Sequence, residues 1–332
     1  MGMPSQIVRI IIEANNRKNF TGKGLFIGRQ STYLTEPMVT KLFLEEKLHI
    51  NKHKPFKIDN STRGSQGKGW VSDSSLLSNF CDMDFVASDV TDYEGAEIVM
   101  DLNEPLRADL RERFDFIYNG SCLDNLFNTS NAIQGITQML NAEGTIVHLE
   151  HGTDCNSPYL KFTPGWIFDY YLINRFNRVQ VFIAYFNKWD GDWDLFEWNP
   201  VIDFDRKKLD WHFQPLKGMD YFLIAIAEKG GSSTSSVAPM QEHYRTEKDK
   251  QIYNALALNN YDRLCADKIE WNKNEFHQCV NYADVVKVHS LLARCLDPKL
   301  VWKIRKRLGR QQPMPKIPAN TKFRRSLSGG SL

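Results

Sequence analysis

The sequence predicts an α/β fold in which a mostly parallel sheet lies between layers of helices. Short apolar runs that stop on glycine or polar residues alternate with stretches of helical periodicity, as in a doubly wound sheet. These runs lie at residues 23–28, 84–89, 96–102, 114–121 and 145–150. Two later β-rich segments, 177–186 and 219–230, predict a terminal antiparallel pair that completes the sheet.

Composition places the chain among ordinary soluble globular proteins, with 42% hydrophobic and 25% charged residues in 332. The N-terminus lacks a signal-peptide series, and no apolar run approaches the roughly 20 residues that span a bilayer. The six cysteines include no CxxC pair, so they indicate reduced thiols and no zinc site. We therefore expect a cytoplasmic protein.

The elements between the predicted strands follow from their local residues. Residues 5–12 fit a short strand or a helix, and Pro37 near the start of 35–48 indicates the crossover helix. The segment 70–80 predicts a short helix capped near Ser72 or Asp73, and residues 126–140 predict another helix.

The chain divides by composition into four parts. Residues 1–230 form the α/β domain, with an aromatic insertion at 187–217 whose Asp190-Gly191 pair predicts a hairpin turn. Residues 231–239 are rich in Gly and Ser and indicate a linker. Residues 240–308 predict a helical appendix, and 309–332 a basic, disordered tail.

Charge is distributed unevenly between the body and the end of the chain. The net charge is +2, yet the segment after residue 302 contains nine basic residues and no acidic one. The basic residues are Lys303, Arg305, Lys306, Arg307, Arg310, Lys316, Lys322, Arg324 and Arg325. Without them, 33 basic residues stand against 40 acidic ones, so the body carries about −7. This balance makes the body an unlikely nucleic-acid binder, whereas the tail is suited to an acidic partner.

Polar or small residues end five predicted strands in chain order. They are Gly28, Asp89, Asp101, Asn119 and Glu150. In an open parallel sheet, ligands bind outside the carboxyl ends of the strands. The sequence therefore predicts a cleft for a nucleotide-type cofactor.

Three segments in this order resemble class I S-adenosylmethionine-dependent methyltransferases, and more narrowly a bacterial methyltransferase-domain family with a DYEGA…DLNEPL motif. They are SDVTDYEGAEIVMDLNEPL (88–106), RFDFIYNGSCLDNLFN (113–128) and MLNAEGTIVHLEHG (139–152). FTPGWIFDYYL (162–172) matches a further aromatic segment of that family. The resemblance covers roughly residues 20–230 and implies a Rossmann-like, seven-stranded, mostly parallel sheet with a terminal antiparallel strand.

The resemblance also implies where S-adenosylmethionine binds. Asp89 matches the position that accepts both ribose hydroxyls, and Asp101 the position that accepts from the adenine amino group, with Leu102 against the ring. The first turn is expected near the methionine part and the ribose, and the end of the fourth strand near the sulfonium. The implied cofactor-binding residues are Ile27, Gly28, Arg29, Gln30, Asp89, Val90, Asp101, Leu102, Asn119, Gly120 and Ser121.

The sequence departs from that family at three positions. Arg29 stands where a second glycine is usual, Asn125 replaces the family's histidine, and NAEG at 141–144 replaces a P-G-G turn. These departures support an alternative hypothesis, a non-catalytic methyltransferase-like scaffold that acts through the helical appendix and the basic tail.

Three residues at the predicted mouth of the cleft are candidates for catalysis, namely Asp124, Glu150 and His151. Transfer to an oxygen acceptor benefits from a general base or a metal. His148 lies one strand period before Glu150, which favours a buried, hydrogen-bonded histidine. Glu150, His151 and Asp154 form a weaker candidate for a divalent cation site, and we predict no metal.

The acceptor pocket is expected from the segments 49–75, 152–170 and 187–217. They contain eight aromatic residues, Tyr159, Phe162, Trp166, Trp189, Trp193, Phe196, Trp198 and Trp211. Such residues stack on sugar rings or planar acceptors, but they equally fill a core or a homodimer interface. The sequence-based hypothesis is therefore a methyltransferase that O-methylates a sugar, a glycan or another small molecule.

Overall fold

A computed structural model describes residues 2–153, 158–201, 209–216, 219–266 and 321–329. Within this part of the chain, one sheet of nine strands has the order β11-β9-β8-β10-β7-β6-β1-β4-β5. Their pairing makes seven of these nine run in one direction, whereas β9 and β10 run in the other. The predicted α/β class and the reversed strand are confirmed, but the sheet has more than the seven strands predicted.

Five parallel strands form one half of the sheet: β1 (Thr21–Ile27), β4 (Asp82–Asp89), β5 (Ile98–Val99), β6 (Phe114–Gly120) and β7 (Leu140–His151). In the register, Ile27 pairs with both Ser88 and Asn119, and Asn119 pairs with His148. The carboxyl ends of β4, β1, β6 and β7 therefore meet at one edge. The strand order reverses between β1 and β6, which is the switch point where ligands bind in such sheets.

The other half is antiparallel and consists of β8 (Arg178–Phe186), β9 (Trp193–Trp198), β10 (Asp220–Glu228) and β11 (Thr321–Leu327). β8 and β9 form a hairpin whose turn contains Asp190-Gly191, as predicted for this pair, but its first arm is β8 and lies outside the expected insertion 187–217. β10 lies between β7 and β8. The hairpin thus extends the sheet beyond β8.

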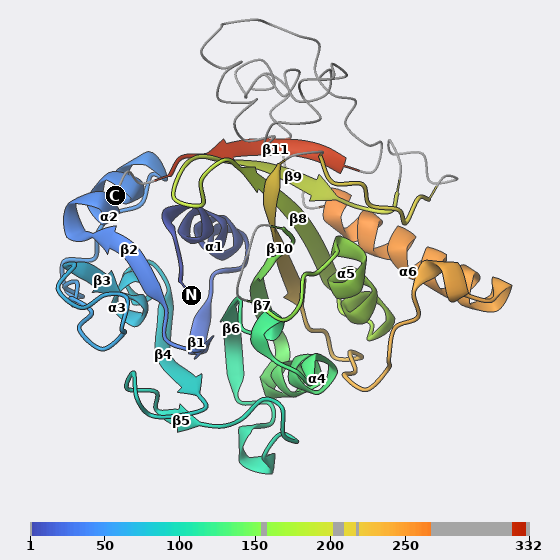
Figure 1. Cartoon of the computed structure of the whole chain (residues 1–332), viewed down its shortest axis with the longest axis horizontal. Coiled ribbons are helices and arrows are strands. Elements are labelled where there is room, and N and C mark those ends of the chain that lie inside the picture. Colours follow the sequence, from blue (N-terminus) through green and yellow to red (C-terminus); the bar gives the residue numbers. More distant parts are fainter. Residues whose placement is uncertain (1, 154–157, 202–208, 217–218, 267–320, 330–332) are drawn as a thin grey trace, which may run out of the picture.

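β11 corrects the prediction of a disordered tail for residues 321–327. It pairs with β9 and lies along the edge of the sheet (Figure 1). β9 would otherwise present unpaired backbone groups. Arg324 donates to Glu13 at 2.8 Å, and Arg325 pairs with Glu13 and Glu46 at 3.5 and 3.7 Å. Part of the basic excess is therefore neutralised by acidic residues of the same chain.

Helices cover both faces of the sheet. They are α1 (Ser5–Lys18), α2 (Glu36–Glu45), α3 (Asp73–Ser78), α4 (Thr129–Met139), α5 (Pro164–Ile173) and α6 (Glu247–Ala266). A separate two-stranded sheet pairs β2 (Ser31–Thr35) with β3 (Trp70–Ser72). Residues 5–12, which fitted either type of element, lie in α1. The Ser72 cap of α3 is confirmed, since its side chain accepts from the Ser75 N–H at 3.4 Å.

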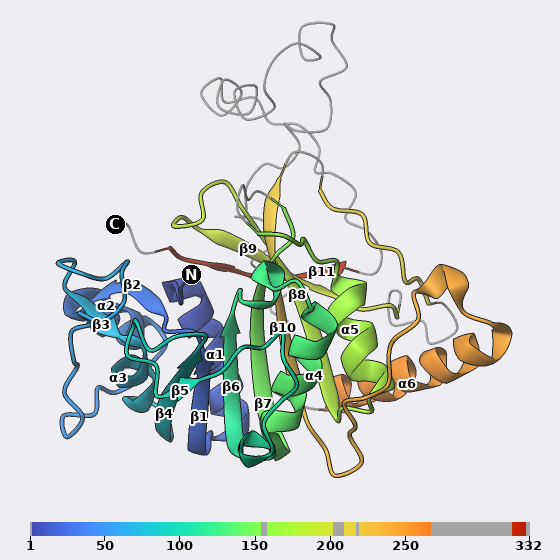
Figure 2. The ribbon, with the colours of Figure 1, turned by 60° about the horizontal axis from the view of Figure 1, so that its bottom comes forward.

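Two hydrophobic cores lie on opposite faces of the sheet. One contains α1 residues such as Ile7 and Ile11 against Phe26 of β1, and the other contains Ile133 of α4 against Leu25. Leu25 and Phe26 are adjacent and point to opposite faces because side chains alternate along a strand. Figures 1 and 2 show α4, α5 and α6 grouped around one half of the sheet, away from α2 and α3.

The predicted linker and the start of the appendix are attached to the α/β domain. Asn174 accepts from the N–H groups of Thr234 and Val237, through its carbonyl oxygen at 2.9 Å and Oδ1 at 3.1 Å. Asn260 of α6 bonds both the N–H and the C=O of Val179 in β8. The rest of the appendix, residues 267–308, lies outside the described residues. None of the described helices has the length and apolarity needed to cross a bilayer.

Candidate functional site

Gly28 and Asp89 lie side by side at the switch point. Gly28 has φ of +75°, which favours glycine, and its N–H donates to the Ser88 carbonyl at 2.7 Å. A Cβ at Gly28 would lie 3.8 Å from Asp89 Oδ2. Asp89 Oδ1 accepts from the Val90 N–H at 2.6 Å, while Oδ2 has no hydrogen bond within the described residues. The Asp89 carboxylate thus lies beside a residue without a side chain, and its Oδ2 is available to a ligand.

Gln30 bridges the carboxyl ends of β1 and β6. Its Nε2 donates to the carbonyls of Ile27 and Gly28 at 3.0 and 2.8 Å, which fixes the orientation of the amide. Its Oε1 is buried and has no partner in the described part of the chain, and it lies 2.1 Å from the place where Gly120 would carry a Cβ. Only glycine fits at position 120, and a buried acceptor faces the switch point.

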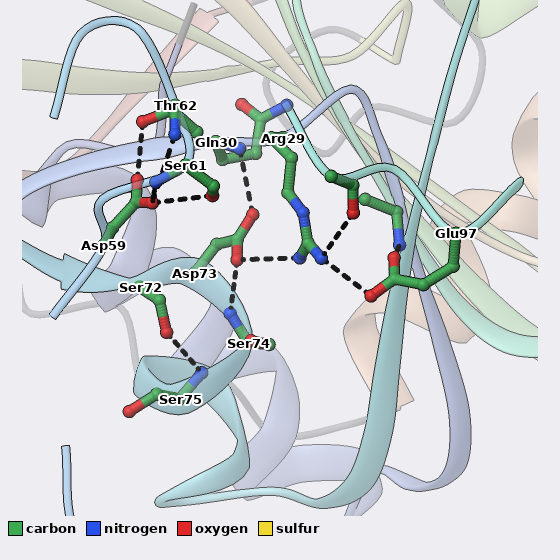
Figure 3. A network of polar contacts seen from close by, with 12 residues as sticks. Arg29, Gln30, Asp59, Ser61, Thr62, Ser72, Asp73, Ser74, Ser75 and Glu97 are labelled. Atoms are coloured by element: carbon green, nitrogen blue, oxygen red, sulfur yellow. Dashed lines mark hydrogen bonds and ion pairs between the residues drawn. The ribbon is translucent and has the colours of Figure 1, made fainter. Parts of the chain in front are cut away.

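Arg29 connects the first turn to two neighbouring segments (Figure 3). Its guanidinium donates to Glu97 Oε1 at 2.7 Å and to the Gly95 carbonyl at 3.1 Å, and it lies 3.4 Å from Asp73 Oδ1. Burial raises the pKa of Asp73, whereas the charge of Arg29 lowers it. The side chain that replaces the usual glycine therefore ties the turn to α3 and to the loop before β5.

Asp101 lies two residues beyond β5, because that strand covers Ile98–Val99 and not the predicted 96–102. Its Oδ1 accepts from the N–H and Nδ2 of Asn103 at 2.8 and 2.9 Å, which closes a turn. Leu102 is buried in the core, and Asn131 of α4 donates to its carbonyl at 3.1 Å. Asp101 and Val90 are exposed.

A second group of polar side chains is fully buried on one face of β6 and β7. Asn119 Nδ2 lies 2.8 Å from His148 Nδ1 and also donates to Glu150 Oε1. His148 Nε2 lies 2.6 Å from the Tyr171 hydroxyl of α5. The prediction that His148 is a satisfied core histidine is thereby confirmed, and Glu150 is enclosed with it.

The pKa values of this buried pair move in opposite directions. Burial lowers the pKa of His148 to about 3, so the ring is neutral. Burial, together with the nearby charge of Asp124, raises the pKa of Glu150 well above its usual range. Both groups therefore favour their neutral forms, as expected for ionisable groups without solvent.

Asp124, Ser121 and His151 form a third cluster, at the carboxyl end of β7 and just beyond that of β6. Asp124 belongs to a short 3₁₀ turn, η2 (Leu123–Asn125), and its Oδ2 accepts from Ser121 Oγ and lies 2.5 Å from His151 Nδ1. Asn125 Nδ2 donates to Asp124 Oδ1 at 2.7 Å. Within the described residues, Nε2 of His151 has no hydrogen-bond partner. The arrangement can orient an imidazole and leave one nitrogen for proton transfer.

Several residues of these clusters were not predicted from the sequence. Tyr171 comes from α5, and Asp73 and Glu97 bind Arg29 from other elements. No local pattern distinguishes them, because their roles depend on packing between distant segments. Asp154, part of the candidate cation site, lies outside the described residues, and the described residues contain no group of three possible metal ligands.

The eight aromatic residues of the expected acceptor segments separate into two sets. Phe162, Trp193, Phe196 and Trp198 are buried in the cores, which confirms the core interpretation for them. Tyr159 and Trp189 are exposed, and Trp166 and Trp211 are partly buried at the edge of a core.

No family model and no curated protein matches the chain. Among solved structures, it is similar to the N1-methyltransferase of 1,6-didemethyltoxoflavin from Burkholderia thailandensis, with TM-score 0.33, 12% identity, and 68% of this chain and 78% of that chain covered. It is also similar to the CMeT domain of the citrinin polyketide synthase (0.28, 12%, 45% and 35%). A structure described as a Zn-dependent alcohol dehydrogenase from Rhodobacter sphaeroides matches as well (0.26, 14%, 52% and 52%).

The chain spans about a third to a half of the length of the last two structures. Likeness at these TM-scores is too weak to assign a function, and a shared fold hosts many chemistries in any case. Function must therefore be argued from the clusters of residues themselves.

Proposed function

We propose that this chain is an S-adenosylmethionine-dependent methyltransferase that transfers the methyl group to an oxygen of a sugar, a glycan or another small molecule. The observation that carries the proposal is the pairing of Gly28 with Asp89 at the switch point of the sheet, with Gln30 Oε1 beside them. The sequence resemblance over residues 88–152 supports it independently.

The residues at the switch point fit the cofactor. Asp89 Oδ2 lacks a partner within the described residues and would accept from the ribose hydroxyls. Gln30 Oε1 is a buried acceptor that a ligand ammonium group, such as that of the methionine part, would satisfy. The turn at Asp101 is closed through Oδ1, so Oδ2 takes no part in it, and Leu102 is the next residue in the chain. Asp89 therefore supplies a hydrogen-bond acceptor beside the open backbone of Gly28, and Gly120 makes room for the Gln30 amide.

When bound, S-adenosylmethionine supplies a methyl group that is already activated for displacement. The protein then has to position the acceptor and remove its proton. Asp124 accepts from Nδ1–H of His151, which leaves the lone pair on Nε2 to take the proton of an acceptor hydroxyl. In this proposal His151 is the general base and Asp124 orients its ring. The buried Glu150 forms part of the inner wall of the site.

The test is a calorimetric titration of the full chain with S-adenosylhomocysteine. We expect micromolar binding by the wild type and at least about a tenfold loss for Asp89→Ala, because the ribose loses a charged acceptor. Asp82→Ala is the matched control, since Asp82 begins the same strand and is exposed at its opposite end.

Absence of binding by the wild type would reject the proposal and favour the non-catalytic scaffold. Equal losses in the Asp89 and Asp82 variants would reject the assigned site. Cofactor-dependent methylation of any acceptor would in turn reject the scaffold hypothesis.

A further inference from the structure

A cavity of about 540 Å³ lies beside α5, on the side that faces the segments 209–216 and 239–242. Trp166, Trp211 and Phe213 supply aromatic walls, and Asp169 and Glu242 supply carboxylates. Among the described residues that line it, there is no lysine or arginine. A volume of this size accommodates a small organic molecule.

Asp169 contributes a buried acceptor to this cavity. Its side chain is 10% exposed, and its Oδ2 accepts from Arg245 Nη2 at 2.5 Å. Its Oδ1 is buried and has no partner in the described part of the chain. Nη1 of Arg245, in the same ion pair, is also buried without a partner there, so the pair leaves one acceptor and one donor unsatisfied.

Arg245 is fixed behind the cavity and does not line it. Its guanidinium stacks on Trp211 and Tyr253, with 4.3 and 3.5 Å from its central carbon to the ring centroids. It compensates the charge of Asp169, whereas Glu242 adds a second negative charge nearby. Burial and the charge of Glu242 both raise the pKa of Asp169, and even with Arg245 opposing them it reaches about 7.

We propose that this cavity is a binding site for an organic cation, an ammonium group carried on an apolar or aromatic body. An N–H of the ligand would donate to Asp169 Oδ1, and its charge would balance Glu242. Tryptophan faces attract cations, and water-poor surroundings strengthen that attraction.

Among the described residues, the lining of this cavity includes none of Ser121, Asp124 and His151. Phe162 contacts both places: its N–H donates to the His151 carbonyl at 2.9 Å, and its ring packs at a tilt against Trp166, with 4.6 Å between the centroids. Phe162 is buried and does not line the cavity. The proposal therefore does not depend on the proposed methyltransferase function, and its test needs no cofactor.

The experiment is a titration of the full chain at pH 7.5 with 2-phenylethylamine, which is an ammonium ion at that pH, and with its neutral analogue 2-phenylethanol. Binding is followed by calorimetry and by the indole N–H signals in ¹⁵N spectra. We expect a dissociation constant of about 1 mM or lower for the amine and binding of the alcohol weaker by about tenfold or more.

Gly165→Leu tests the location of the site. Gly165 lines the cavity in the first turn of α5, and a Cβ there would meet no atom within 4 Å. Leucine should therefore fill the cavity without harm to the fold, and it has the better helix propensity. We expect this variant to lose amine binding and to keep the wild-type melting temperature.

Glu242→Gln tests the charge, with Glu247→Gln as its control. Both substitutions remove one negative charge, but Glu247 is exposed on α6 and pairs with Lys250. We expect about a tenfold weaker affinity for the amine in the first variant and no change in the second. Equal affinities for amine and alcohol, no saturable binding, or unchanged binding by Gly165→Leu would overturn the proposal.

Discussion

Oδ2 of Asp124 lies 2.5 Å from Nδ1 of His151, although the residues are 27 positions apart. The same oxygen accepts from the backbone N–H of His151 at 3.2 Å and from Ser121 Oγ. One carboxylate therefore fixes both the backbone and the ring of the histidine. In the proposed reaction this geometry selects the tautomer in which Nε2 is unprotonated.

Asp124→Asn should slow methyl transfer by about 10²-fold or more and leave the affinity for S-adenosylhomocysteine unchanged, because an amide cannot hold the ring in that tautomer as a carboxylate does. The measurement is the single-turnover transfer rate from labelled cofactor to the acceptor identified in a screen. Asp109→Asn, at an exposed site paired with Arg107, is the control. An unchanged rate would remove Asp124 from the mechanism.

Glu150→Gln should raise the free energy of unfolding at pH 8 by about 1–3 kcal/mol relative to the wild type. Since burial raises the pKa of Glu150, the wild type loses stability as the pH rises from the ordinary pKa of a glutamate towards that raised value. Glutamine does not titrate and keeps an oxygen for Asn119. Urea unfolding at pH 4 and pH 8 measures this, with Glu143→Gln, at an exposed position, as control.

For His148, the stability depends on pH with the opposite sign to that for Glu150. Its pKa is lowered to about 3 in the folded state, so the unfolded chain takes up a proton below about pH 6.5 and the folded chain does not. The wild type should lose about 2 kcal/mol more than His148→Gln between pH 7 and pH 5. His243→Gln, on an exposed histidine, should follow the wild type. Parallel curves for all three proteins would contradict a neutral buried ring.

Arg29→Ala should destabilise the fold by about 1–3 kcal/mol at pH 7, because Asp73 stays buried without its cation. The loss of Arg29 raises the pKa of Asp73 further, so the deficit should grow as the pH rises from 4 to 7. Thermal unfolding measures it. Arg107→Ala removes an exposed ion pair and should shift the melting temperature little.

Residue patterns alone predicted the α/β class, the parallel strands up to β7 and the β8–β9 turn. Alternating apolar runs and Gly or Asp at their ends are local properties, and local properties can be recognised in a sequence. The places where the prediction failed, β11 and the short β5, depend on pairing between distant segments. Thr321–Leu327 pairs with β9, which lies more than 100 residues earlier in the chain.

The candidate site, too, was predicted from the sequence in part only. The order of strand ends in the sequence determined that Gly28, Asp89 and Asn119 would meet at one edge, because parallel strands align their carboxyl ends. Only the tertiary structure decided which side chains face a ligand and which are enclosed. Glu150 and His151 are adjacent in sequence, yet alternation along β7 encloses one beside Asn119 and sets the other against Asp124. That choice comes from the packing of α5 and η2, which no local pattern encodes.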